Sequence, residues 1–142
     1  MALHMMKLVV GPDSLEDFAA CQRQYYTTFK GHKANIVRTR HTPRQAQEIV
    51  ETGGSIYRII KGYMCCRQRI VGFDQEDTED GKKCLILTDP EIIRTYPTMR
   101  RPFQGWRYLK ENSAPPDIGP YIEGQDASTI EMEIELKALG LL

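Results

Sequence analysis

The sequence predicts an α+β fold, a small curled and mostly antiparallel sheet or partial barrel covered by two or three helices. Segments with strand patterns outnumber those with helical patterns, and the helical patterns lie near the two ends of the chain. Asp80-Gly81 is a dipeptide favoured in tight hairpin turns, which predicts that the strands on either side of it are antiparallel neighbours. The length of 142 residues and the hydrophobic content of 41% suit one domain covering the whole chain, 1–142.

The first elements are predicted to be a strand, a helix and a second strand. An apolar run over residues 5–10 has the composition of a strand. Ser14 can cap a helix whose apolar and aromatic residues recur at helical spacing as far as Phe29, with Gly31 as its stop. The β-branched content of residues 35–41 predicts the next strand.

A second helix has clear start and stop signals. Thr42 supplies a cap, Pro43 suits the first helical position, and Gln45 completes a capping box. Gly53-Gly54 would end this helix.

The centre of the chain predicts strands over 55–61, 63–73 and 82–88, and a further strand over 105–109. Prolines interrupt the chain between the last two of these strands. Residues 111–127 contain three prolines and two glycines, which predicts an extended connection.

An acidic helix over residues 128–140 is predicted to follow. Apolar residues alternate with glutamates over 129–137, which is a strand pattern. Ser128 and Glu131 nevertheless form a capping box, and the residues after them are strong helix formers. A helix is favoured, with an edge strand as the alternative.

Charge is distributed unevenly although the net charge is zero. Residues 1–72 hold eleven Lys and Arg against five Asp and Glu, and residues 82–110 hold seven against two. The loop over 73–81 has five acidic residues and no basic one, and residues 111–142 have seven acidic residues against one basic. A basic body favours polyanionic partners, and an acidic tail could compete with them.

Several functional classes find no support in the sequence. No apolar run is long enough to span a membrane and the first seven residues lack the features of a secretory signal, so we expect a cytoplasmic protein. The four cysteines and three histidines lack the spacing of metal ligands, and no cofactor or catalytic motif occurs. The acidic loop lacks the ligand pattern of a calcium site. A cysteine nucleophile at Cys65 or Cys66, aided by His32 or His41, is less favoured than buried thiols. Whether the chain is an enzyme stays open.

Arginine pairs and neighbouring aromatic residues are the candidate binding groups. Alternate residues of a strand project from one face, so two of the pairs would present guanidinium roots about 7 Å apart, a spacing that suits successive phosphates. Aromatic rings interleaved with cations are typical of proteins that bind single-stranded nucleic acid. The candidates are Arg38, Arg40, Arg67, Arg69, Arg100, Arg101, Trp106, Arg107 and Tyr108.

Three functions follow from these residues. We expect binding of RNA or another single strand first. The alternatives are an enzyme or binding protein for a nucleotide or other anionic metabolite, clamped by Arg67, Arg69 and Arg107, and a protein-interaction domain. Core packing of Trp106 and ordinary surface exposure of the arginines are the alternatives to all three functions. Strand alternation would also place Trp106 and Tyr108 on the opposite face from Arg107, which weakens a combined site.

The sequence also resembles a short bacterial family of uncharacterised conserved proteins over nearly its whole length. The resemblance rests on six segments and implies no activity. A weaker analogy rests on a helix that ends in glycine and is followed by a strand with Arg-x-Arg-Ile. This pattern is similar to that of the PUA-like pseudo-barrel RNA-binding domains. The six segments are 1–8, Gly54-Ser55-Ile56-Tyr57, Ile60-Lys61-Gly62, Arg67-Gln68-Arg69-Ile70, 100–110 and Leu139-Gly140-Leu141-Leu142.

Overall fold

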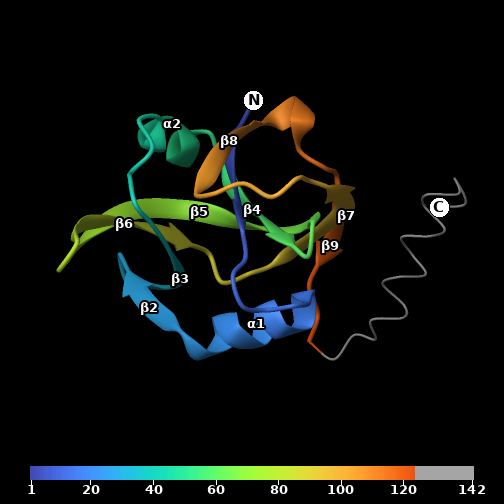
Figure 1. Cartoon of the computed structure of the whole chain (residues 1–142), viewed down its shortest axis with the longest axis horizontal. Helices are drawn as coiled ribbons and strands as arrows, with labels where there is room; N and C mark the ends of the chain where they lie inside the picture. The colour runs from blue at the N-terminus through green and yellow to red at the C-terminus, as the bar shows by residue number, and fades with distance from the viewer. Residues whose placement is uncertain (124–142) are drawn as a thin grey trace, which may run out of the picture.

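The computed structural model describes residues 1–123, which are mostly strand with two short α-helices (Figure 1). No helix within this part of the chain is long and apolar enough to cross a membrane. The elements in order are β1 (Leu3–Leu8), α1 (Leu15–Gln24), β2 (Tyr26–Phe29), β3 (His32–Thr39), α2 (Ala46–Glu51), β4 (Ser55–Ile60), β5 (Tyr63–Thr78), β6 (Gly81–Thr88), β7 (Ile93–Met99), β8 (Trp106–Lys110), the 3-10 turn η1 (Glu111–Ser113) and β9 (Asp117–Pro120).

The strands form one open, curled and mixed sheet in the order β2-β3-β6-β5-β4-β1-β8, with β7 pairing β5 and β9. Of the described strand pairs, β1 with β4 is parallel and the others are antiparallel. The 16-residue strand β5 pairs with β4 and β7 along its first half and with β6 along its second half. A register shift between Ile70 and Gly72 marks the change. The curled, mostly antiparallel sheet expected from the sequence is therefore present, with less helix than an α+β fold implies.

Two hairpins use the same dipeptide. Lys30-Gly31 joins β2 to β3 and Lys61-Gly62 joins β4 to β5, and all four residues have positive φ angles between 50° and 85°. Positive φ at both central positions matches the right-handed twist of the flanking strands. The antiparallel pairing predicted around Asp80-Gly81 is confirmed in β5 and β6.

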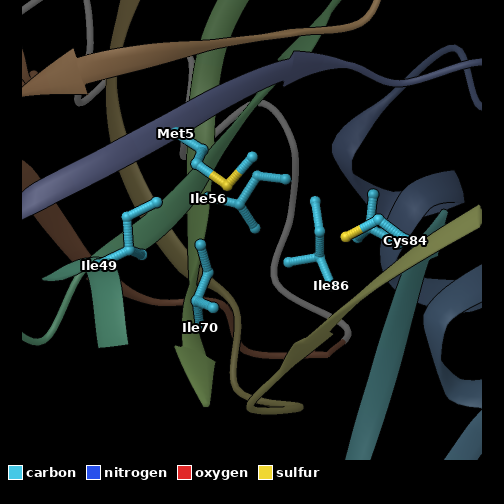
Figure 2. Close-up of a cluster of buried hydrophobic side chains, with 7 residues drawn as sticks. Met5, Ile49, Ile56, Ile70, Cys84 and Ile86 are labelled. Carbon is cyan, nitrogen blue, oxygen red and sulfur yellow. The ribbon is translucent and has the colours of Figure 1, made fainter. Parts of the chain in front are cut away.

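Buried clusters lie on both faces of the sheet, and the two helices cover those on one face. Met5, Ile56 and Ile70 are fully buried in one cluster with Ile49 of α2, as Figure 2 shows. In Figure 1, α2 lies at the top of the view and α1 at the bottom. Helix α1 buries Phe18 against a second cluster. Burial of such side chains, at about 25 cal/mol per Å² of apolar surface, is the main stabilising contribution.

Several boundaries differ from the sequence predictions. The helix predicted as far as Phe29 ends at Gln24, because residues 26–29 pair with β3 instead. The second helix begins at Ala46 rather than at Pro43, and Gln45 occupies its cap without a side-chain hydrogen bond. The connection predicted over 111–127 contains η1 and β9.

Strand β7 was not expected because it contains Pro97. Proline removes a backbone donor, so a proline-containing segment normally argues against a paired strand. Here the register with β5 shifts between Met64 and Cys66, beside Pro97, and the strand tolerates the proline there. The helix predicted over 128–140 lies outside the described residues.

Candidate functional site

A segment that we call the strap, residues 111–117, connects β8 to β9 across one face of the sheet (Figure 1). Its middle residue, Ala114, packs against a buried cluster that includes Met6, Tyr57 and Leu109. The backbone of Tyr96 donates to the carbonyl of Pro116 at 3.0 Å, which ties the strap to β7. The strap therefore covers the middle of the sheet rather than running free between two strands.

The register brings four polar side chains together beneath the strap. Met5 pairs with Ile56 in β4, so His4 lies on the same face as Ser55 and Tyr57. Tyr57 in turn pairs with Arg67 of β5. Three neighbouring strands, β1, β4 and β5, thus each contribute to one polar cluster.

Both ring nitrogens of His4 are engaged. Its Nδ1 accepts a hydrogen bond from the backbone N–H of Ser55 at 2.9 Å, and its Nε2 lies 2.5 Å from a carboxylate oxygen of Glu111. Since Nδ1 accepts, the proton of the neutral ring is on Nε2 and is donated to Glu111. The ring is buried and meets Tyr57 edge to face at a centroid distance of 5.0 Å. His4 consequently holds the start of the strap in place.

Arg67 fixes the other end of the strap. Its Nε and Nη2 donate to the two carboxylate oxygens of Asp117 at 2.9 and 2.7 Å, and its Nη1 donates to the Ser55 hydroxyl at 2.8 Å. Hydrogen bonding to Arg67 lowers the pKa of Asp117, and the same hydrogen bond raises the pKa of Arg67. The bidentate geometry orients the guanidinium plane toward the strap.

Tyr57 is the member of this cluster whose hydroxyl has no hydrogen bond with a described residue. Only 4% of its surface is exposed, and burial raises the pKa of its hydroxyl to about 12. No described residue forms a hydrogen bond with this hydroxyl. A neutral phenol inside a polar cavity can donate one hydrogen bond and accept others.

These groups line a cavity of about 300 Å³ between the strap and the sheet. A hydroxyl, a guanidinium and two carboxylates converge there, so the cavity offers both hydrogen-bond donors and acceptors. Among the described residues no cluster of His, Cys, Asp and Glu could hold a metal ion. The arrangement suits binding of a small polar molecule. The lining consists of Ala2, His4, Gly53, Tyr57, Arg67, Glu111, Ala114, Pro115, Pro116 and Asp117.

Three of the candidate arginines share this face of the sheet. Arg67 lines the cavity. Arg69 pairs with Ser55 and is exposed, and Arg107 pairs with Met6 on the same face. The guanidinium of Arg107 lies over the ring of Phe103, 4.7 Å from its centroid.

Trp106 and Tyr108 lie on the opposite face. They pack edge to face at 4.8 Å and contact the cluster around Met5, and the Tyr108 hydroxyl accepts from the backbone of Gln45 at 3.1 Å. Strand alternation separates these rings from Arg107, as the sequence predicted. They are therefore placed for packing against the core.

The remaining candidates are spread over other parts of the molecule. Arg38 on β3 is paired with Glu76 at 3.0 Å, and Arg40 follows it on the exposed surface. The backbone of Arg100 donates to the carbonyl of Gly62 at 2.9 Å, and Arg101 is exposed in the loop that follows β7. The nine candidates do not converge on one surface.

Sequence reasoning missed His4, Tyr57, Glu111 and Asp117. His4 was judged only as a metal ligand, and the two carboxylates lie in a segment taken for a linker. One signal was available: Pro115-Pro116 stiffens the chain between the two carboxylates, which favours a fixed strap over a flexible connection.

Comparison with known proteins gives one match. The model of a family described as "Protein of unknown function (DUF1489)" matches residues 5–142. The chain belongs to this family. No curated protein and no solved structure matches the chain. The uncharacterised family expected from the sequence is thus confirmed for this DUF1489 chain, and its site must be interpreted from its own geometry.

Proposed function

We propose that the protein binds a small polar metabolite with an anionic group, such as a nucleotide, in the cavity beneath the strap. The observation that carries this proposal is the Tyr57 hydroxyl, which belongs to a residue that lines the cavity and has no hydrogen-bond partner among the described residues. A hydrogen bond between protein and ligand contributes about 0.5–1.5 kcal/mol net. A ligand that pairs with the hydroxyl would gain that free energy.

The cavity walls suit a flat ligand with mixed hydrogen-bonding edges. Glu111 and Asp117 present acceptor oxygens, whereas Arg67 presents donors. A nucleobase carries donors and acceptors side by side on its edges, and carboxylates and arginines are common partners for them. At about 300 Å³ the cavity is at the small end of ligand-binding sites, which suits a single base or a molecule of similar size.

Arg69 supplies the expected anion contact. It lies two residues from Arg67 on the same strand face, so their roots are about 7 Å apart. No described carboxylate forms an ion pair with Arg69. Its exposed guanidinium is therefore available to a phosphate that protrudes from the cavity on this face.

Calorimetric titration with nucleoside monophosphates, the matching nucleosides and inorganic phosphate tests this function. We expect at least one monophosphate to bind more tightly than its nucleoside and than phosphate alone. Tyr57→Phe should weaken binding about tenfold by removing the hydroxyl. Arg69→Gln should reduce the affinity for the monophosphate to that for the nucleoside, whereas Arg40→Gln, an exposed change elsewhere, should have no effect.

Two results would contradict the proposal. One is the absence of binding by every nucleotide tested. The other is binding that Tyr57→Phe leaves unchanged, since the ligand would then not occupy the cavity.

A second candidate function, binding of single-stranded nucleic acid, is favoured by the arginines exposed on this face. Arg69 and Arg107 flank the cavity on opposite sides of Tyr57, and Arg107 stacks on Phe103. Exposed arginines beside an aromatic ring suit a strand laid across the sheet, with one base inserted into the cavity.

Mobility-shift titration of a single-stranded RNA at two salt concentrations tests this second function. Binding should weaken steeply with salt, because neutralised phosphates release counterions. Replacing Arg69 and Arg107 together by Gln should reduce the salt dependence by about two phosphate contacts. Salt-independent binding, or none, would exclude it.

A further inference from the structure

A second cavity, of about 270 Å³, lies on the other side of the sheet from the strap, between α1, β3 and the end of β1. Its basic lining residues are Lys7, Arg38 and Arg58, and no Asp or Glu lines it. The rest of the wall is mainly apolar, with Leu8, Val9, Val10, Phe18, Ile36 and Val37. It thus combines positive charge with a hydrophobic surface, which the strap cavity does not.

Arg58 is the central group of this cavity. Its side chain is buried, with 6% of the residue exposed, and its guanidinium lies 5.4 Å from the centroid of the Phe18 ring. Nε and Nη2 donate to the backbone carbonyls of Lys7 and Leu8 at 3.3 and 3.1 Å. Nη1 forms no hydrogen bond with a described residue.

No described carboxylate balances the charge of Arg58. Burial lowers the pKa of Arg58 to about 10, so the guanidinium is still charged at neutral pH. Burial, followed by repulsion from Arg58, also lowers the pKa of the neighbouring Lys7. Buried charges in proteins are normally paired, and an unpaired one destabilises the fold.

We propose that this cavity is a binding site for an organic monoanion with an apolar body, such as a short-chain carboxylate. The carboxylate lies against Nη1 of Arg58 and the Lys7 ammonium, and the hydrocarbon part contacts Phe18 and Val37. Two of the arginine's nitrogens already donate to carbonyls, which leaves room for a single acidic group rather than a phosphate held from several sides. The site is separate from the strap cavity and does not depend on the function proposed there.

Calorimetric titration of the full chain with hexanoate and with neutral hexanamide tests the proposal. The two probes share a tail and differ in charge, so we expect hexanoate to bind at least about tenfold more tightly. Lys7→Gln should reduce that difference severalfold, because Arg58 alone then contacts the carboxylate. Lys82→Gln removes a lysine from the exposed β5–β6 hairpin and serves as the matched control, with no change expected.

A second measurement does not depend on a variant. The pKa of Lys7, followed by NMR of its side chain, should rise when hexanoate is added, because the bound carboxylate offsets repulsion from Arg58.

Equal affinity for the two probes would overturn the proposal, as would hexanoate binding that Lys7→Gln leaves intact. Loss of hexanoate binding in Tyr57→Phe would also overturn it, since the anion would then occupy the strap cavity.

Discussion

Arg67 and Asp117, fifty residues apart in the sequence, are joined by two parallel hydrogen bonds of 2.9 and 2.7 Å. Arg67 lies in the middle of the sheet, and Asp117 is the first residue of the edge strand β9. The pair therefore fixes where the strap ends, and with it the position of the strap over the cavity that Tyr57 lines. Several expected outcomes depend on this arrangement.

Asp117→Asn should destabilise the protein at neutral pH but not in acid. Because the pKa of Asp117 is held below its usual 3.8, its contribution is present above about pH 4 and is lost as pH falls through the lowered pKa. The effect should be about 1 kcal/mol or less, since Asp117 is partly exposed. Urea unfolding of both proteins as a function of pH measures it, with Asp77→Asn in the exposed hairpin as the control. A difference that persists unchanged in strong acid would contradict the prediction.

Tyr57→Phe should remove the most alkaline tyrosine titration. The pKa of Tyr57 is about 12 in the fold against 10.0 for an ordinary tyrosine. A raised pKa means that the fold favours the protonated phenol, so this contribution is complete below pH 10 and is lost as pH rises toward 12. Tyrosinate absorbance follows the titration, and Tyr25→Phe, a change at an exposed ring, is the control. The same high-pH component in both variants would disprove the assignment.

Gly54→Ala should destabilise the fold more than Gly72→Ala does. A Cβ at Gly54 would lie 2.0 Å from the backbone oxygen of Leu3, which cannot move without disturbing β1. A Cβ at Gly72 would lie 2.5 Å from the Phe29 ring, a side chain on the edge strand β2 that can shift. We expect losses of about 3 and about 1 kcal/mol, measured by chemical unfolding. Equal losses would show that β1 yields as easily as a side chain.

Asn35→Asp should be among the most destabilising conservative changes in the chain. The Asn35 amide donates to the carbonyls of Gln22 and Tyr25 at 2.9 and 3.2 Å, and these bonds hold the end of α1 beside β3. In the variant, a carboxylate oxygen would replace the donating nitrogen and would face both carbonyl oxygens. We expect the free energy of unfolding to fall by about 3 kcal/mol. Lys33→Ala, an exposed change on β3, should cost much less in the same unfolding experiment. Comparable losses would mean that the amide is not what holds the end of α1.

The sequence was sufficient for the central strands but not for the ends of the helices. Strands 55–61, 63–73 and 82–88 were predictable because glycine turns and β-branched residues mark them locally. The end of α1 was not, since residues 26–29 have helical spacing and are held in β2 by pairing with β3. That pairing depends on the Lys30-Gly31 turn. From the sequence alone, the glycine of this turn is equally compatible with the end of a helix.

The candidate site was predictable only in part. Strand alternation placed Arg67 and Arg69 on one face and separated Arg107 from Trp106, because period-two geometry is local. The partners of Arg67 could not be predicted, since Asp117 and Ser55 approach it through long-range pairing that leaves no periodic trace in the sequence. Function therefore depends on the residues that the topology, rather than any motif, brings together.

Strand β5 has a mechanical consequence. Its first half carries β4 and β7 while its second half carries β6, so both parts of the sheet share one continuous backbone. Backbone amides in the central part of this strand, residues 64–73, should exchange with solvent only when the whole protein opens, and they should do so with a common free energy. A ligand held beneath the strap on β5 would then slow hydrogen exchange in β6, on the far side of the register shift. This slowing of exchange would occur without any contact between the ligand and β6.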